Sequence, residues 1–406
     1  MDSFNKKKLA YAILSISALT VMAGAAMAPA LGVIGKHFSG ENPLLVQLII
    51  SMPALTIIIT NLFFSSLCKI AGTRTIAVTG LVSYILFGAG AFFFDNIWII
   101  LALRALLGIS VGMIMPLSTG LLSYYFPPEE QGKLMGLSAF MNQMGGVVAT
   151  LLSGLLANIS WNCSFLVYLL GIFVLILVLA VLPDERLATG EAAESCAPDY
   201  YESESGLTKA RKNSTDERVS LLRFMPSVAG MYLQMLLFFI YPANFALITG
   251  RGSTMSGNEI TLIMVGLDLI AAVIGIMFGR MMKLLPAKMK YVAPLSFMAG
   301  YALLGTGASA ALILSGSFFV GIGNGAGMPY LNTIASIKGG KDAATTVMPL
   351  ISAALYLGQF TSPLIITPLS RLVDSPFSPY LIGVLFGLLY LIQAYASRKY
   401  QALKAL

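Results

Sequence analysis

Long stretches without a charged residue alternate with short polar segments along the whole chain. Each stretch is near or above the ~18–20 residues that a helix needs to cross ~30 Å of hydrocarbon. The strict apolar–polar alternation of barrel strands is absent, so the pattern predicts membrane-spanning helices. The twelve stretches are 9–35, 43–68, 75–94, 96–128, 134–157, 162–183, 224–250, 260–279, 291–308, 311–337, 343–370 and 375–397.

Three boundaries in this pattern are inferred. Residues 134–183 divide near Asn158–Asn162, and residues 291–337 divide near Gly307–Ala310. The N-terminal lysines Lys6–Lys8, followed by an apolar run, resemble a secretory signal peptide. Because the apolar run continues to Gly35, we interpret this segment as the first membrane helix.

Lysine and arginine placement predicts the orientation, since cytoplasmic loops are enriched in these residues. Threading twelve spans places 21 of them on the side of both termini and 3 on the other side. We therefore expect a multi-pass protein of the plasma (inner) membrane with both termini in the cytoplasm. The three on the opposite side are Lys36, Arg251 and Arg371.

Composition agrees with lipid as the solvent. Charged residues make up 11% of the chain, whereas a soluble domain has about a quarter. The net charge of +7 is spread over short loops without an aromatic-interleaved basic run, so we expect no nucleic-acid partner. The one long polar stretch predicts a cytoplasmic linker at 184–220 between an N-terminal bundle, 1–183, and a C-terminal bundle, 221–406.

The two halves contain an internal repeat. Gly108-x3-Gly112-x3-Pro116 recurs 213 residues later as Gly321-x3-Gly325-x3-Pro329. The loop Ser65-x3-Lys69-x2-Gly72-x-Arg74 corresponds to Gly279-x3-Lys283-x2-Pro286-x-Lys288, displaced by 214. Two matches at nearly one offset predict two structurally equivalent halves.

These motifs resemble the Major Facilitator Superfamily over essentially the whole chain. The loop after the second span matches the Leu, second Gly and last Arg of the family signature Gly-x-Leu-x-Asp-Arg-x-Gly-Arg-Arg through Leu67, Gly72 and Arg74. The helix 4 signature Arg-x3-Gly-x3-Gly fits Arg104, Gly108 and Gly112. Two further stretches, 125–133 and 358–363, look like the family's loop into helix 5 and its helix 11.

The resemblance implies an all-α integral membrane protein with twelve transmembrane helices in two pseudo-symmetric six-helix bundles. It further implies a monomer that moves a small-molecule substrate by alternating access, most like the drug:proton antiporter branch. In this fold, helices 1, 4, 7 and 10 line a central cavity, with 2, 5, 8 and 11 beside them.

Two departures limit what the family implies. Lys69 stands where the family has an Asp that is thought to latch the cytoplasmic side closed. As a positive-inside anchor or a cation at the end of helix 2, Lys69 fits equally well. The helix 5 antiporter signature Gly-x3-Gly-Pro-x2-Gly-Gly is degraded: Gly145 and Gly154 fit, but Ala149-Thr150 replaces Gly-Pro and Ser153 replaces a Gly. This weakens the transfer of export polarity and leaves the fold unaffected.

Two charged residues lie well inside predicted spans, Arg104 and Asp268. A charge at the bilayer centre costs roughly 2.5–3.5 kcal/mol, so each should face a bundle interior or a watery cavity. Our hypothesis is that Asp268 carries the coupling proton or faces a cationic substrate; the alternative is a structural salt bridge between the halves. Arg104 either binds a substrate carboxylate bidentately or is the family's helix 4 arginine, bound to backbone carbonyls.

Polar and aromatic residues complete a candidate cavity, and each type is also common in helix packing. The cavity candidates are Asn142, Gln143, Gln234, Tyr241, Asn244, Tyr330, Asn332, Tyr356 and Gln359. The candidate cytoplasmic gate loops contain Lys69, Gly72, Arg74 and Lys283.

We expect no metal site, because the only histidine, His37, has no second imidazole or thiol nearby in sequence and fits a solvated loop residue.

Enzyme chemistry has little support in the sequence. His-Glu-x-x-His and Gly-x-Ser-x-Gly are absent, as is a buried acidic pair, so we expect no catalytic residues and no cofactor. The predicted function is secondary active transport of a small organic molecule, with proton-coupled export, as in multidrug or metabolite efflux, as the first choice. Proton-coupled uptake or exchange of a small organic anion bound by Arg104 is the alternative.

Overall fold

The computed structural model describes residues 3–183, 224–252, 255–285, 288–307, 309–339 and 347–402. Within these ranges all regular structure is helical. The predicted linker at 184–220 lies outside the described residues. The prediction of an all-helical membrane fold is confirmed.

The first half contains two 3₁₀ segments (η1 and η2) among its α-helices. Its elements are α1 Ser3–Ala25, α2 Leu31–His37, α3 Pro43–Ile70, α4 Thr73–Gly90, η1 Ala91–Phe93, α5 Ile97–Tyr125, α6 Pro128–Ala157, η2 Asn162–Leu170 and α7 Gly171–Val181. The second half contains α9 Met225–Gly252, α10 Gly257–Leu284, α11 Met289–Thr306, α12 Ala310–Gly339, α13 Met348–Ser370 and α14 Ser378–Ala402.

Eleven segments within the described ranges are long and apolar enough to cross a membrane. The remaining predicted span, 291–308, is the ninth along the chain and corresponds to the 18-residue helix α11. It packs against α12 and α14, as the other helices of its bundle pack against one another. Its lower hydropathy reflects Lys290 near its first turn.

Two predicted spans are more irregular than expected. The first, 9–35, is not one helix: α1 ends at Ala25, a turn follows, and α2 begins at Leu31. Pro29 explains the break, because proline has no N–H to continue the helical ladder. The sixth span, 162–183, begins with the nine-residue 3₁₀ segment η2 before α7.

Three helices that follow short connections have a side-chain cap at the N-terminus. Asn42 accepts a hydrogen bond from the backbone of Leu44 at 3.1 Å at the start of α3. Asn96 does the same for Trp98 at 2.9 Å at the start of α5. Ser256 and Glu259 form a capping box on α10. These caps satisfy backbone N–H groups that have no partner within the helix.

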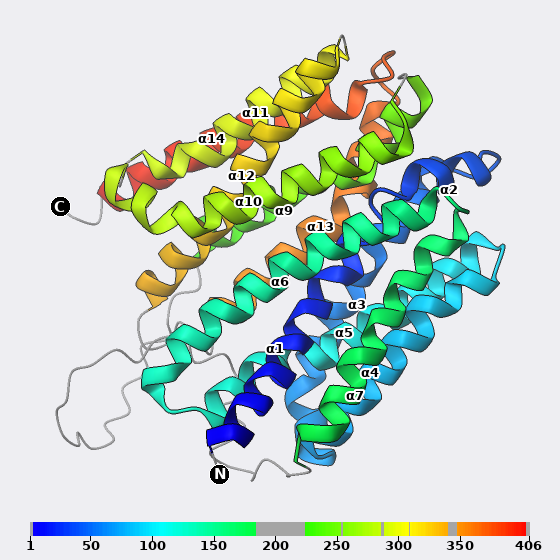
Figure 1. The fold of residues 1–406 in the computed structure, drawn as a ribbon. Helices are drawn as coiled ribbons and strands as arrows, with labels where there is room; N and C mark the ends of the chain where they lie inside the picture. Colours follow the sequence, from blue (N-terminus) through cyan, green and yellow to red (C-terminus); the bar gives the residue numbers. More distant parts are fainter. Residues whose placement is uncertain are drawn as a thin grey trace.

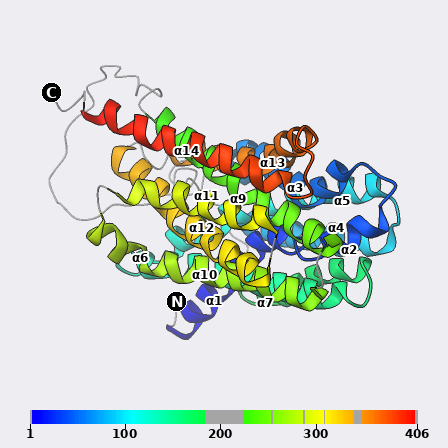
Figure 2. The same cartoon turned by 90° about the horizontal axis from the view of Figure 1, so that it is seen from above.

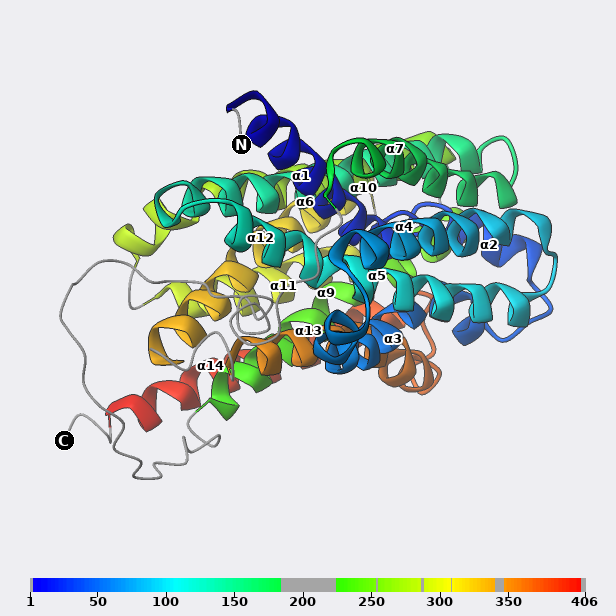
Figure 3. The same cartoon turned by 90° about the horizontal axis from the view of Figure 1, so that it is seen from below.

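The helices form two groups, α1–α7 and α9–α14. Figure 1 shows the second group at upper left and the first at lower right, with α6 beside α10 and α13 between them. In Figures 2 and 3 the short helix α2 again lies at the end of the molecule away from the labelled termini. We call this end, with α2 and the η1–α5 and α6–η2 connections, the distal end.

The repeated glycines explain how the halves correspond. Gly108 lies against Thr56 and the Pro53 carbonyl of α3, and Gly112 lies against Thr60. In the second half, Gly321 and Gly325 lie against the carbonyls of Leu267 and Ala271 in α10. A Cβ at Gly108 or Gly325 would meet backbone atoms, so the close approach of α5 to α3 and of α12 to α10 requires glycine. The predicted internal repeat is confirmed.

A further pair extends the correspondence. Gly145 of α6 lies against the Ala18 carbonyl of α1, and Gly358 of α13 lies against the Tyr232 carbonyl of α9. Gly358 follows Gly145 by 213 positions, the offset already found for α5 and α12. The same helix–helix contact is therefore built twice from backbone-to-glycine packing.

The two bundles contact each other along a boundary that we call the seam. It consists of α3 against α13, α6 against α10, and α2 against α9. Two hydrogen bonds cross it at the distal end, from Arg371 to Asn42 at 2.9 Å and from Asn158 to Asn258 at 2.7 Å.

Gly108→Ala and Gly325→Ala should each lower stability by about 1–3 kcal/mol, because the added methyl forces two helices apart. Thermal unfolding in detergent checks this prediction. Gly266→Ala in α10 is the matched control, since no atom lies within 4 Å of its added Cβ. An equal loss in the control would contradict the packing explanation.

Candidate functional site

Arg104 is enclosed within the first bundle. Its side chain is fully buried, and Nη1 donates a hydrogen bond to the Tyr168 hydroxyl at 2.7 Å. The guanidinium carbon lies 4.9 Å from the centroid of the Phe165 ring and 4.7 Å from that of Tyr168. Both distances suit cation–π attraction.

The 3₁₀ geometry of η2 places the rings of Phe165 and Tyr168 on the same side of the segment. With three residues per turn, side chains at positions i and i+3 lie in line. Phe165 and Tyr168 have this spacing, so both rings reach the same guanidinium. An α-helix would rotate the second ring away from the first.

The Arg104–Tyr168 pair also reaches the end of α1. The Tyr168 hydroxyl donates to the Ala23 carbonyl at 3.2 Å, and the Tyr84 hydroxyl donates to the Leu19 carbonyl at 3.3 Å. Ala23 lies in the last turn of α1, where carbonyls lack helical partners. The two tyrosines therefore stabilise the broken end of the first span.

The second bundle contains an equivalent cluster without the cation. Tyr301 of α11 donates to the Leu237 carbonyl of α9 and stacks on Tyr380 at 6.0 Å. The position that follows Arg104 by 213 is Ser317, whose hydroxyl bonds that of Tyr241 at 2.9 Å. Arg104 thus occupies a position whose counterpart in the second bundle, Ser317, also bonds a tyrosine hydroxyl. This placement favours a structural role for Arg104 over binding of a substrate carboxylate.

Asp268 lies at the seam. The half-buried carboxylate accepts a hydrogen bond from the Thr150 hydroxyl of α6 at 3.1 Å. Among the described carboxylates, it alone has a hydrogen bond to the other bundle. Asp268 and Arg104 have different partners in different places, so the structure does not bring them together as a salt bridge.

Thr150 was not among the site residues predicted from the sequence. It is one of the three residues by which this helix, α6, departs from the antiporter signature. The only signal was its type, a hydroxyl in an apolar span.

An amide network crosses the seam nearer the distal end. Gln47 of α3 donates to Asn244 of α9 at 2.8 Å and accepts from the Thr367 hydroxyl of α13. All three side chains are buried. Asn244 was a predicted cavity residue; Gln47 and Thr367 were not, since only a three-dimensional arrangement reveals partners this far apart in sequence.

Three other predicted cavity residues have neighbours on other helices. The Tyr356 hydroxyl of α13 donates to the Met115 sulfur of α5 at 2.8 Å, across the seam. Gln359 of α13 lies against Gly24 of α1. Asn142 of α6 accepts from Thr20 of α1 at 2.8 Å, within the first bundle.

The remaining cavity candidates have other surroundings. Gln234 donates to the Gly323 carbonyl of α12 at 3.2 Å, and Tyr241 bonds Ser317 of the same helix. These two residues connect helices of the second bundle. Tyr330 is half-buried in α12. Gln143 and Asn332 are half-buried in α6 and α12.

The candidate gate loops are partly described. Arg74 donates to the Leu179 carbonyl near the end of α7 at 2.8 Å, and Gly72 precedes the first residue of α4. Lys283 is exposed in the last turn of α10. Lys69 lies near the end of α3, and its side chain is outside the described part.

The interpretation of His37 as a bland loop residue is wrong. It is the last residue of α2, and its Nε2 lies 2.6 Å from Oδ1 of Asp95. Its ring stacks on Trp161 with centroids 4.4 Å apart. Its partners come from connections that are distant in sequence, which no local pattern indicates.

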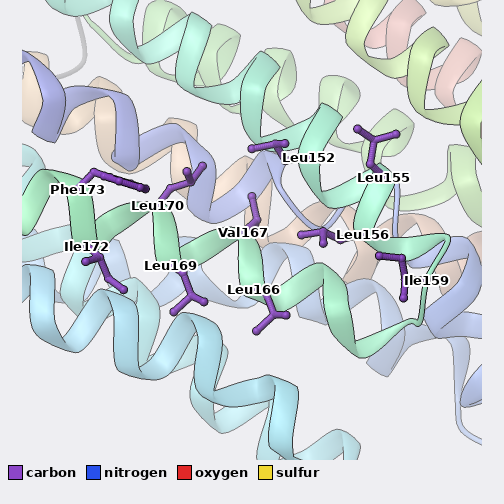
Figure 4. Close-up of a pocket in the computed structure, with 10 residues that line it drawn as sticks. All are labelled: Leu152, Leu155, Leu156, Ile159, Leu166, Val167, Leu169, Leu170, Ile172 and Phe173. Atoms are coloured by element: carbon purple, nitrogen blue, oxygen red, sulfur yellow. The ribbon is translucent and has the colours of Figure 1, made fainter.

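A cavity of about 400 Å³ lies outside the seam, between α6 and the η2–α7 segment. Figure 4 shows ten apolar side chains along it and no polar one, so nothing there could orient a polar solute. The candidate site is therefore the seam, with Asp268 as its half-buried carboxylate.

These features define a polytopic helical membrane protein whose two equivalent bundles meet at a polar seam. A family model described as Major Facilitator Superfamily matches residues 13–363. The chain belongs to this family, whose members are transporters.

Similar proteins agree on the fold and differ in function. A bacterial homolog of the human lysosomal transporter Spinster, solved inward-facing and unoccupied, aligns with TM-score 0.74 at 13% identity, covering 98% of this chain and 96% of its own. Quinolone resistance protein NorA of Staphylococcus aureus is 26% identical over 155 residues, 37% of this chain and 39% of NorA. Probable anion transporter 4, chloroplastic, of Arabidopsis thaliana is 31% identical over 64 residues, 16% of this chain and 12% of that protein. The chain thus matches well under half the length of either curated relative.

Tyr168→Phe should lower stability by about 1.5–3 kcal/mol, because Arg104 loses its hydrogen bond to a buried hydroxyl. Tyr380→Phe is the matched control: the Tyr380 hydroxyl is buried and has no hydrogen-bond partner among the described residues. Thermal unfolding of both variants decides, and equal losses would show that Tyr168 acts through ring packing alone.

Proposed function

We propose that this chain is a secondary active transporter that exports small organic molecules in exchange for protons, with Asp268 as the proton carrier. The observation that carries the proposal is the hydrogen bond from Thr150 to Asp268 across the seam. A carboxylate at this position changes surroundings whenever the bundles separate.

The physical argument begins with the cost of a buried charge. Among the described residues, ionised Asp268 has one neutral hydroxyl, that of Thr150, as its hydrogen-bond partner and no basic side chain in an ion pair with it. Removal from water disfavours the charged form, and a proton relieves that cost. Opening the seam replaces this environment with water and favours release of the proton. Alternating access thereby couples proton movement to bundle movement.

Distal closure supports alternating access. The Gln47–Asn244–Thr367 network and the Arg371–Asn42 bond hold the bundles together at this end. A typical net hydrogen bond contributes about 0.5–1.5 kcal/mol, so a few of them form a closure that substrate binding can reverse. Asn142, Tyr356 and Gln359 line the proposed path. The distal end faces the outside, the termini face the cytoplasm of a plasma-membrane monomer, and the gate loops border the cytoplasmic opening.

Export of organic compounds is favoured over uptake of an anion. Arg104, the candidate carboxylate ligand, is fully buried against two rings and a tyrosine hydroxyl. The partial match to quinolone resistance protein NorA also supports efflux. Exchange of a small organic anion is the second candidate, supported by the short match to the probable anion transporter.

Asp268→Asn should abolish accumulation driven by a pH gradient and leave downhill exchange without a gradient intact. Proteoliposome flux, screened over organic cations and carboxylates, measures both. Thr150→Val is the matched variant: it keeps the carboxylate, so gradient-driven transport persists with an altered pH dependence. Wild-type accumulation by Asp268→Asn would end the coupling role, and carboxylate flux lost in Arg104→Gln would favour the second candidate.

A further inference from the structure

The short helix α2 belongs by sequence to the first bundle and contacts the second. It packs against α9 as well as α3. Gly32 lies against the Ala246 carbonyl and Gly35 against the Leu247 side chain, both in α9. If the distal end opens, α2 has to leave one of its two neighbours.

The C-terminal end of α2, its tip, is attached to the first bundle through His37, which contacts Asp95 and Trp161. We call these three side chains the His37 clamp. His37 and Asp95 are 2.6 Å apart, and the imidazole stacks on Trp161 at an interplanar angle of 22°. Asp95 precedes α5 and Trp161 precedes η2. The clamp thus connects α2 to two other connections of its own bundle.

The N-terminal end of α2 is joined to α1 by a short turn that offers little resistance to movement. Ala26–Ala30 form a turn between α1 and α2, and Pro29 interrupts the helical ladder. A helix of seven residues with a hinge at one end keeps its place through the contacts of its body and its tip. The body contacts the second bundle, so the tip decides which bundle α2 follows.

We propose that His37 is a positioning residue that keeps α2 with the first bundle when the distal end opens, and that acid on the distal side strengthens its hold. This proposal rests on the transport function proposed above. A protonated imidazole forms a charge-assisted hydrogen bond with Asp95 and gains a cation–π contact with Trp161. A neutral imidazole keeps a hydrogen bond to the Asp95 carboxylate but loses the attraction between opposite charges.

The charged surroundings set the direction of the pH response. Asp95 is the charged partner, Lys36 is the exposed neighbour on α2, and Glu41 follows in the connection to α3. The connection around Trp161 contributes no acid or base apart from the thiol of Cys163. An imidazole exchanges its proton within the physiological pH range, so the clamp tightens as distal pH falls and loosens as it rises.

Trp161 itself reports the clamp. The chain has two tryptophans, so Trp98→Phe leaves Trp161 as the only indole emitter. Acidification of the purified protein in detergent from about pH 8 to about pH 5 should reduce Trp161 emission, because a stacked imidazolium quenches indole fluorescence. His37→Gln should abolish this loss. An unchanged titration in His37→Gln would overturn the proposal.

Transport tests the consequence with equal pH on both sides of proteoliposomes. Acidification should raise the exchange rate of the wild type, because a tighter clamp keeps α2 with the first bundle when the distal end opens. His37→Gln should lose this increase. His37→Arg, a permanent cation, should show the wild-type acid rate at all pH values. Identical pH profiles in both variants and wild type would overturn the positioning role. If wild type shows no proton-coupled flux but Trp161 still titrates through His37, the proposed function fails and the clamp stands.

Discussion

The cost of placing a charge in hydrocarbon governs this structure. At roughly 2.5–3.5 kcal/mol for a charge at the bilayer centre, the two intramembrane charges are arranged in opposite ways. Arg104 is enclosed within one bundle, between two aromatic rings and a tyrosine hydroxyl. Asp268 is placed between the bundles, with a single hydroxyl as its partner. The first arrangement lies within one bundle, and the second joins the two bundles.

The internal repeat makes this contrast interpretable. Glycine contacts of α5 with α3 recur between α12 and α10, and tyrosine-to-carbonyl bonds of α4 with α1 recur between α11 and α9. Within this shared scaffold, Arg104 has a serine as its counterpart. The second bundle forms its own version of the cluster without a cation. Arg104 is therefore understood as a local stabiliser of the broken first span, which leaves the seam to Asp268.

Spans, repeat and family were predictable because hydrophobic length and glycine spacing are local properties of the chain. The site was less predictable. Asp268 was identified from its charge alone, but its partner Thr150 is 118 positions away. Gln234 was predicted to line the cavity from its type alone, and it donates to the Gly323 carbonyl of α12 within the second bundle.

Two further differences have separate causes, one local and one that depends on the tertiary structure. Pro29 lies inside an apolar run that reads as one helix, yet it ends the helical ladder and creates α2. His37 has no metal-ligand pattern around it, and its role depends on Asp95, which lies 58 positions later in the chain. Contacts between distal connections depend on how six helices pack, so a sequence pattern cannot show them.

The central claim, that Asp268 takes up and releases the coupling proton, is tested most directly by infrared difference spectroscopy of the reconstituted protein between about pH 5 and about pH 9. The account predicts a carboxylic-acid carbonyl band that appears on acidification and is absent from Asp268→Asn. Difference spectra in that region that are identical for the variant and the wild type would contradict it.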